Sequence, residues 1–417
     1  MSLIQVFLKV ISKLSKRILI ITQFFDPEPT FKGLLFAKEL VSRGFEVEVI
    51  TGFPNYPGGT IYPGYKIKII QRAVIEGVLV TRVPLFPSHD KSKLGRIACY
   101  ISFAFSSLIY GLFFAKRPNV IYAYHPPLTV GISAIVIKFF RRVPVVLDIQ
   151  DMWPDTLKAT GMLNNVRLLE FTSKVCKVVY KAVTQIVVLS PGFKKLLIDR
   201  GVPARKIEVI YNWADELKIK ETGGFTPKEF ANIGGFKILF AGNIGQAQGL
   251  NVIADAALLL KDECPTLNFV VLGKGLKLSE LKLRVKSMSL NNVHFISHVS
   301  MDEVGSFLNC ADVLLVHLNS DPLFEVTIPG KTQAYMAAGK PLIMGVRGDA
   351  ANLISMADCG VCIEPQDAFS LAEAVKHLSS LSSADIQALG ENAVNFYDHK
   401  LSVKVGVDAF SEIFQRF

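Results

Sequence analysis

The sequence predicts an α/β protein made of two doubly wound, Rossmann-like domains. Short apolar segments of strand length alternate with segments of helical periodicity through most of the chain. Over residues 212–233 this periodicity is lost and glycine and charged residues become frequent, which marks a domain boundary. A length of 417 residues accommodates two domains of about 200 residues each. We therefore place the domains at residues 17–212 and 213–400, between an extension of residues 1–16 and a final amphipathic helix at residues 401–417.

The first series of elements defines the predicted N-terminal domain. Its helices include residues 34–42, which end before Gly44, and residues 192–200, which Ser190 and Pro191 begin as N-cap and first helical residue. No G-x-G-x-x-G follows the first strand, so a dinucleotide-binding domain is disfavoured. The predicted strands are residues 17–22, 46–51, 78–83, 120–123, 143–148, 185–189 and 207–210.

The second series defines the predicted C-terminal domain. Ser300 and Glu303 form a capping-box pattern that predicts the start of a helix. Because ligands of open α/β sheets bind at the carboxyl ends of the strands, we expect the two domains to face a cleft that holds a ligand. The predicted strands are residues 237–242, 267–272, 293–296, 313–317, 342–346 and 361–363.

Residues 328–346 combine a loop, a short helix, a glycine stop and a buried strand. Pro329 and Gly330 open the helix, and Gly339 supplies a left-handed residue after its end. Lys331 adds a cation to the free backbone amides of the helix N-terminus, an arrangement that suits a phosphate. The competing interpretation is an ordinary helix–strand connection with a solvated Lys331.

Composition and charge narrow the function. Half of the residues are hydrophobic, so the chain is globular with ample core. A net charge of +10 favours anionic partners such as a nucleotide or an anionic membrane, while no RNA-binding signature appears and nucleic acid is not expected. The six cysteines show no disulfide framework, which fits a reducing cytoplasm. The C-x-x-C of Cys359 and Cys362 has no second pair, so a metal or redox role is not expected.

Two segments suggest membrane contact. Residues 1–16 are basic and amphipathic at helical spacing, as in a helix lying on anionic lipid; the competing interpretation is packing on the first domain or a frayed terminus. Residues 97–115 are uncharged, flanked by Arg96 and Lys116, and just long enough to span a bilayer. Because they include serines and tyrosines and the α/β alternation continues on both sides, we expect a buried or interfacial helix instead.

Six motifs occur in order along the chain: residues 36–49, 120–127, 148–155, 241–245, 272–275 and 328–346. In this order and spacing they resemble the family 4 glycosyltransferases over nearly the whole chain beyond the extension. The segments 53–59 and 151–155 look like the branch of that family that builds bacterial surface polysaccharides. Members similar to this branch have been assigned transfer of N-acetyl-L-fucosamine from a UDP donor.

The resemblance implies a retaining hexosyltransferase of the GT-B fold. The expected reaction moves a sugar, such as N-acetyl-L-fucosamine or another N-acetylated aminosugar, from a UDP-sugar to a lipid-diphosphate-linked saccharide in O-antigen, capsule or exopolysaccharide synthesis. It also implies that the first domain holds the acceptor, that the second holds the donor, and that the final helix packs back on the first domain. No Asp-x-Asp occurs in the chain, so we expect no metal requirement and no cofactor beyond the donor substrate.

Departures from the family pattern alter the expected donor site. Where the family places an Arg and a Lys to hold the diphosphate, this chain has the neutral Asn243 and Gln248, and Ala334 replaces a second glutamate. We therefore expect Lys331, Lys274 and helix N-termini to supply most of the charge neutralisation. The expected donor-binding residues are Gly33, Asn243, Gln248, Gly273, Lys274, Glu325, Gly330, Lys331, Thr332 and Gln333.

The expected catalytic residues are His125, Lys331 and Glu325. His125 follows a strand at its carboxyl end, and the resemblance places it near the donor sugar; the competing role is to cap a backbone carbonyl. Glu325 or Gln333 is expected to bind the ribose hydroxyls. The resemblance and the aromatic ring between two carboxylates assign the acceptor to Asp151, Trp153 and Asp155.

The expected partners are a nucleotide sugar, a lipid-linked saccharide and the anionic inner membrane surface, with the protein in the cytoplasm and peripherally attached to the cytoplasmic membrane. Two alternative functions stay open. One is an enzyme similar to a UDP-N-acetylglucosamine epimerase, which would act on the donor without an acceptor. The other is a non-catalytic partner that binds a nucleotide sugar or a lipid without turnover.

Overall fold

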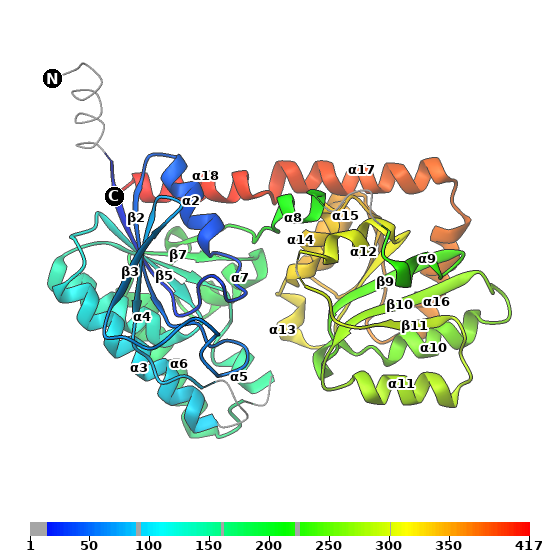
Figure 1. The fold of residues 1–417 in the computed structure, drawn as a ribbon, viewed down its shortest axis with the longest axis horizontal. Helices are drawn as coiled ribbons and strands as arrows, with labels where there is room; N and C mark the ends of the chain where they lie inside the picture. The colour runs from blue at the N-terminus through cyan, green and yellow to red at the C-terminus, as the bar shows by residue number, and fades with distance from the viewer. Residues whose placement is uncertain (1–14, 89–92, 160–161, 222–225, 301) are drawn as a thin grey trace, which may run out of the picture. The chain divides into compact units, whose positions relative to one another are not determined.

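The computed structural model describes residues 15–88, 93–159, 162–221, 226–300 and 302–417 (Figure 1). The predicted extension, residues 1–16, lies almost wholly outside the described residues. The chain divides into two compact units. Unit 1 runs to Leu189 and includes Phe193–Ile210 and Val407–Phe417, and unit 2 consists of Ser190–Gly192 and Tyr211–Gly406.

Unit 1 is built on an eight-stranded sheet with the order β3-β4-β2-β1-β5-β6-β7-β8. Only the pairing of β3 with β4 is antiparallel; the other neighbouring strands run parallel. The chain order reverses between β1 and β5, which makes their carboxyl ends the switch point of this sheet. The strands are β1 (Arg17–Ile21), β2 (Glu46–Gly52), β3 (Gln71–Ile75), β4 (Val78–Val83), β5 (Val120–His125), β6 (Val145–Ile149), β7 (Gln185–Val188) and β8 (Ile207–Val209).

Helices cover both faces of this sheet. Tyr122 of β5 packs its ring against Phe36 and Phe410, so α2 and α18 lie on one face. The contacts of α3 with α4, and of α4 with β5 and β6, place these two helices on the other face. The helices are α2 (Leu34–Ser42), α3 (Lys93–Phe113), α4 (Leu128–Arg141), α5 (Asp155–Ala159), α6 (Val166–Ala182), α7 (Pro191–Asp199), η1 (Ala204–Lys206) and α18 (Val403–Gln415).

Unit 2 is built on a six-stranded, fully parallel sheet with the order β11-β10-β9-β12-β13-β14. Its apolar core lies on both faces of the sheet, as a doubly wound fold requires. The switch point falls between β9 and β12. The strands are β9 (Phe236–Asn243), β10 (Leu267–Lys274), β11 (Val293–Ile296), β12 (Val313–His317), β13 (Leu342–Gly345) and β14 (Gly360–Cys362).

The helices of unit 2 alternate with these strands along the chain. They are α8 (Glu216–Glu221), α9 (Lys228–Ala231), η2 (Gln246–Gln248), α10 (Asn251–Leu260), α11 (Leu278–Ser287), α12 (Val304–Cys310), α13 (Pro322–Glu325), α14 (Gly330–Ala337), α15 (Asp349–Ala357), α16 (Ala368–Ser380) and α17 (Ser383–Lys400).

Two local predictions differ from the structure. The edge strand β3 was not predicted, because most of its side chains are exposed and give no apolar pattern. The helix predicted from Ser300 begins only at Val304. The Glu303 carboxylate does accept the backbone N–H of Ser300 at 3.0 Å, so the capping pattern closes a turn in front of the helix.

Candidate functional site

The switch point of unit 2 is a gap between two strands that helix α14 fills. β9 pairs with β12 only at Ile238 and Leu239, although β9 continues to Asn243 beside β10. The Tyr335 hydroxyl of α14 closes the gap, because it accepts the N–H of Ala241 at 2.8 Å and donates to the carbonyl of the same residue at 3.0 Å. This anchors α14 with its N-terminus at the carboxyl ends of the strands.

Lys331, in the first turn of α14, is buried at its charged end. Its Nζ lies 3.5 Å from the centre of the Phe240 ring, and a β-carbon on Gly242 would stand 3.1 Å from it. Although the stem of the side chain is only half-buried, Nζ is shielded from solvent and has no hydrogen-bond partner within the described residues. Burial lowers the pKa of Lys331 to about 7. A buried amine of this kind needs an anionic partner to be stable when protonated.

The neighbours of Lys331 in the first turn of α14 have different environments. The hydroxyl of Thr332 is buried and has no hydrogen-bond partner within the described residues. Gln333 is also buried. With its side-chain amide turned so that its hydrogen bonds are satisfied, the amide nitrogen donates to the carbonyls of Pro329 and Gly330, 3.1 Å from each. Gln333 therefore stabilises the turn that presents Lys331, and in this structure it is not open to a ribose.

Glycines bring the carboxyl ends of β9 and β10 into close contact. Gly242 and Gly273 both have φ in the left-handed half of the Ramachandran map, and a β-carbon on Gly273 would lie 1.9 Å from the Gly242 carbonyl oxygen. The two predicted donor-binding residues that follow, Asn243 and Lys274, are exposed at these strand ends. Lys274 thus provides a solvated cation, in contrast to the buried amine of Lys331.

His317, which the sequence reasoning did not single out, holds the loop that carries Gln248. It ends β12 and is fully buried; its Nδ1 donates to the Gln248 carbonyl at 2.7 Å, and its Nε2 accepts the Gln366 N–H at 2.9 Å. Gln248 in turn accepts the Gly245 N–H through its side chain at 3.0 Å. The strand-end rule that identified His125 applies equally to His317 and could have found it.

We expect His317→Leu to weaken UDP binding about tenfold, because the loop that carries Gln248 loses its attachment. It should also destabilise unit 2 by about 2 kcal/mol, since the backbone groups of Gln248 and Gln366 both lose their partner. Calorimetric titration with UDP and chemical unfolding measure the two effects. His294→Leu is the matched control, because within the described residues His294 bonds only the Asn268 side chain, at 2.9 Å. Equal UDP affinity in the two variants would rule out a positioning role for His317.

Glu325 ends the short helix α13 and is half-buried. Its backbone packs against Gly348, where a β-carbon would lie 2.0 Å from the Glu325 carbonyl oxygen. Its carboxylate raises the pKa of Arg347, after the larger effect of the Glu364 carboxylate. No hydrogen bond within the described residues occupies the Glu325 side chain, so it stays the predicted ribose ligand in preference to the buried Gln333.

His125 lies at the carboxyl end of β5 in unit 1. It is fully buried against the edge of Trp153, with ring centroids 5.5 Å apart, and neither ring nitrogen has a partner within the described residues. Burial lowers its pKa to about 3, so the imidazole is neutral. Neither ring nitrogen caps a backbone carbonyl of another residue in the described part of the chain. The catalytic role of His125 stays a prediction.

Asp151 lies among aromatic side chains near His125. Burial raises the pKa of Asp151 to about 6. Burial also raises the pKa of Tyr100, to about 12, and of Tyr56, and the Asp151 carboxylate adds to both shifts, which places these two rings near it. Trp153 approaches Tyr100 with ring centroids 6.5 Å apart. A carboxyl group surrounded by aromatic rings suits the stacking and hydrogen bonding of a sugar.

Gly33 and Asp155 each lie beside groups that the sequence did not indicate, and their roles in ligand binding stay predictions. The Asp26 carboxylate accepts the Leu34 N–H at 2.6 Å and fills the space where a Gly33 side chain would lie. The Asp26 carboxylate therefore already lies at the N-terminus of α2, where a bound phosphate would have to compete with it. Asp155 pairs with Arg200 at 2.5 Å, and Arg200 also donates to the Trp153 carbonyl. Asp155 thus supports the shape of the segment, and Asp151 is left as the carboxylate for an acceptor.

No group of three or more His, Cys, Asp or Glu side chains within the described residues could hold a metal ion. The absence of a metal requirement stays a prediction. In the C-x-x-C motif, Cys359 is buried and the burial raises its pKa to about 12, while burial also raises the pKa of Cys362. Thiols held in the protonated form are poor metal ligands and nucleophiles.

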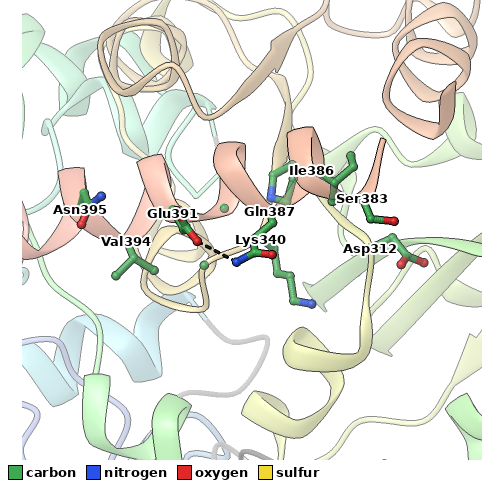
Figure 2. Close-up of a pocket in the computed structure, with 11 residues that line it drawn as sticks. Asp312, Lys340, Ser383, Ile386, Gln387, Glu391, Val394 and Asn395 are labelled. Carbon is green, nitrogen blue, oxygen red and sulfur yellow. Dashed lines mark hydrogen bonds between the residues drawn. The ribbon is translucent and has the colours of Figure 1, made fainter. Parts of the chain in front are cut away.

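A hollow of about 460 Å³ in unit 2 lies away from this chemistry (Figure 2). Its wall includes Asp312, which precedes β12, and Pro341, which precedes β13, together with polar residues of α17 such as Gln387 and Glu391. These positions are at the amino ends of the strands. Because ligands of such sheets bind at the carboxyl ends, we do not assign the donor to this hollow.

Two family descriptions match the chain by sequence. The glycosyl transferase 4-like domain matches residues 34–213, and glycosyl transferases group 1 matches residues 226–396. WbjE of Pseudomonas aeruginosa, named as a glycosyltransferase, is 24% identical over 342 residues, which are 78% of this chain and 82% of that protein. WcaI of Escherichia coli K12, named for a glycosyl transferase of colanic acid biosynthesis, is 24% identical over 351 residues, 81% of this chain and 85% of that protein.

Solved structures share the fold at low sequence identity. HepE of Anabaena in complex with UDP superposes with a TM-score of 0.71 at 15% identity, covering 96% of this chain and 100% of that chain. A glycosyltransferase from Rickettsia africae superposes with a TM-score of 0.67 at 16% identity, covering 97% of this chain and 98% of that chain. The predicted fold class, two Rossmann-like units of the GT-B type, is confirmed.

Proposed function

Because this chain is a hexosyltransferase assembled from a glycosyl transferase 4-like domain and a glycosyl transferases group 1 domain, we propose that it moves a sugar from a UDP-sugar to a lipid-diphosphate-linked saccharide. The proposed transfer retains the anomeric configuration and contributes to a bacterial surface polysaccharide. The names of WbjE and WcaI and the UDP bound to HepE support this choice of pathway and donor. An N-acetylated aminosugar, such as N-acetyl-L-fucosamine, is the proposed transferred group.

The observation that carries the proposal is the pair of unsatisfied buried groups in the first turn of α14. The Lys331 amine and the Thr332 hydroxyl lie at a strand switch point and lack partners within the described residues. A diphosphate supplies the anionic oxygens that both groups need. The helix N-terminus adds the free N–H groups of Gly330 and Lys331 and a favourable dipole.

The chemistry requires a stabilised leaving group. When the bond between the anomeric carbon and the diphosphate oxygen breaks, the electron pair stays on UDP and its negative charge increases. A protonated Lys331 next to that oxygen stabilises the charge as it forms. The acceptor oxygen then bonds to the anomeric carbon and releases its proton. Asp151, with a pKa of about 6, is suited to accept a proton near neutral pH.

We place the acceptor in unit 1, where the aromatic rings surround Asp151. Arg96 of α3 lies close enough to Tyr100 to lower its pKa against the effect of burial, and the Arg96 Nε is buried without a partner in the described part of the chain. A guanidinium with unsatisfied donors suits a phosphate group of a lipid diphosphate. The six free cysteines fit the proposed location in the reducing cytoplasm, at the membrane.

The test combines a donor screen with a transfer assay. Thermal shift identifies the donor among UDP-N-acetylglucosamine, UDP-N-acetyl-L-fucosamine and UDP-glucose, because a ligand raises the apparent stability. That donor is then incubated with the protein and an undecaprenyl-diphosphate-linked aminosugar. We expect UDP release that depends on the acceptor, and a product with the donor's anomeric configuration by NMR.

Two results would contradict the proposal. Hydrolysis or epimerisation of the donor at full rate without acceptor would identify an enzyme similar to an epimerase. Tight donor binding with no turnover, across the whole donor and lipid panel, would identify a non-catalytic binding partner. A product with inverted configuration would leave the transferase in place and refute retention alone.

A further inference from the structure

Unit 1 carries an exposed apolar surface on two neighbouring helices, which we call the α3–α4 face. Large apolar side chains that are open to solvent recur along one side of α3, at spacings of four or eight residues. More of them follow at the end of α4. The main side chains of the face are Ile97, Ile101, Phe105 and Phe113 on α3 and Phe139 and Phe140 on α4.

Hydrogen bonds show that the two helices run side by side in the same direction. The Thr129 hydroxyl donates to the Tyr100 carbonyl at 3.2 Å, and the Ser133 hydroxyl donates to the Ala104 carbonyl at 2.9 Å. Further along, Arg141 donates to the Gly111 carbonyl at 2.6 Å. The end of α4 therefore lies beside the last turns of α3. Both helices are labelled in Figure 1. The two helices that carry the exposed side chains are therefore neighbours along their length.

The opposite side of α3 belongs to the core of unit 1. The Tyr110 hydroxyl donates to Glu48 at 2.8 Å and accepts from Arg72 at 3.1 Å, while Cys99 and Phe103 are fully buried. Within the described residues α3 is the one helix long and apolar enough to cross a membrane. A crossing would expose the polar groups around Tyr110 to hydrocarbon, which is unfavourable. Helix α3 instead packs one side against the core of unit 1 and leaves its other, apolar side open to a partner.

The charge around the patch selects the partner. From residue 91 to residue 147 the sequence contains no Asp or Glu. Arg96 stands near the start of α3, Arg117 follows its end, and Arg142 follows the end of α4. Lys116 is largely exposed, and its ion-pair partner among the described residues, Glu46, is 3.8 Å away. A large apolar surface on two helices that carry cations and no acidic residue of their own matches an anionic bilayer surface.

We propose that the α3–α4 face docks unit 1 on an anionic lipid bilayer, with the aromatic and aliphatic side chains inserted at the headgroup level and the arginines on the lipid phosphates. The helix lies in the interface and does not span the membrane. Docking does not depend on the sugar chemistry, so it can be tested without donor or acceptor.

The experiment is co-sedimentation of the full-length protein with vesicles of phosphatidylglycerol and phosphatidylcholine. We expect Phe105→Asp to lower the vesicle partition coefficient at least about tenfold. Phe369→Asp is the matched control, because Phe369 lies in unit 2 and is 66% exposed, compared with 63% for Phe105. It should bind vesicles like the unchanged protein. We expect Arg117→Glu with Arg142→Glu to weaken binding to the anionic vesicles and not to phosphatidylcholine alone.

Three outcomes would overturn the proposal. The first is equal vesicle binding by Phe105→Asp and Phe369→Asp. The second is loss of vesicle binding in Phe7→Asp while Phe105→Asp keeps it, which would assign the membrane contact to the N-terminal extension. The third is a lipid-free dimer that Phe105→Asp converts to a monomer without changing vesicle binding, which would make the face an interface between two copies of the chain. Circular dichroism of each variant checks that its helices are intact.

Discussion

We expect Lys331→Ala to lower kcat with the active donor by about 10²- to 10³-fold, the usual effect of removing one preorganised group that stabilises a developing negative charge. Lys331 is the buried cation at the strand switch point, and its amine has no competing partner within the described residues. The matched control is Lys274→Ala, which removes an exposed lysine from the end of the neighbouring strand. The exposed charge is screened by water, so we expect a loss of no more than about tenfold.

The affinity for UDP should also depend on pH through Lys331. With a pKa of about 7 in the free protein, the amine is protonated below pH 7 and neutral above it. Binding of a diphosphate favours the protonated form, so each pH unit above 7 should weaken binding by up to about tenfold. UDP itself does not titrate in this range, because its phosphate ionises near pH 6. Titration calorimetry from pH 7 to pH 9 measures the slope.

Lys331→Arg keeps the positive charge at this site and removes its titration near pH 7. An arginine stays charged at every pH used, so its UDP affinity should be flat from pH 7 to pH 9, and that of Lys331→Ala should be weak and flat. An unchanged turnover in Lys331→Ala, or the same pH slope in all three proteins, would show that another group holds the diphosphate.

The largest expected effect on stability comes from Lys32→Met. Lys32 and Asp148 form an ion pair at 2.8 Å with both side chains fully buried, and burial lowers the pKa of Lys32 against the favourable effect of Asp148. Asp148 also accepts hydrogen bonds from Tyr122 at 2.5 Å and from Gln150 at 2.6 Å. Removing the lysine leaves a buried carboxylate without its counter-ion, which costs about 3 to 5 kcal/mol.

Tryptophan fluorescence can measure the stability of unit 1 separately, because each unit contains one tryptophan. Of the two tryptophans, Trp153 lies in unit 1 and Trp213 in unit 2. In a Trp213→Phe background, fluorescence therefore follows the unfolding of unit 1 in denaturant. Lys38→Met is the matched control, because it breaks an exposed pair with Glu76 at 3.1 Å and should cost less than about 1 kcal/mol.

A double variant tests the origin of the effect. Lys32→Met with Asp148→Asn removes both charges and keeps an acceptor for Tyr122, so it should recover much of the stability that Lys32→Met loses. If Lys32→Met costs no more than Lys38→Met, the buried pair does not stabilise unit 1. If the double variant is as unstable as Lys32→Met, the loss comes from packing, because Lys32 also contacts the rings of Tyr124 and Phe410.

The elements of the fold could be predicted because hydrophobic periodicity is a local property. The helix at Leu34–Ser42 and the strands at Val78–Val83, Val293–Ile296 and Val313–His317 have the predicted bounds. The edge strand β3 escaped prediction because solvent covers both sides of it, so its sequence carries no apolar alternation.

The candidate site could be predicted only in part. Lys331 was identified from its place at a helix start, since Pro329, Gly330 and Gly339 are neighbours in the sequence. The same rule gave no sign that the Asp26 carboxylate occupies the helix start at Gly33, because Asp26 lies outside the pattern on which the rule depends. His317 was missed although it ends a strand, because nothing adjacent to it in the sequence indicated its partners, Gln248 and Gln366.

The sequence by itself therefore determined two doubly wound α/β units and a lysine at the helix start of residues 328–346, because side-chain periodicity and helix capping act between residues close together in the chain. Only the tertiary structure decided that the Lys331 amine is buried over Phe240 with a pKa of about 7 and that Gln333 is already occupied. Burial and desolvation depend on atoms brought together from distant segments, and it is these that turn an ordinary lysine into the leading candidate for the diphosphate site.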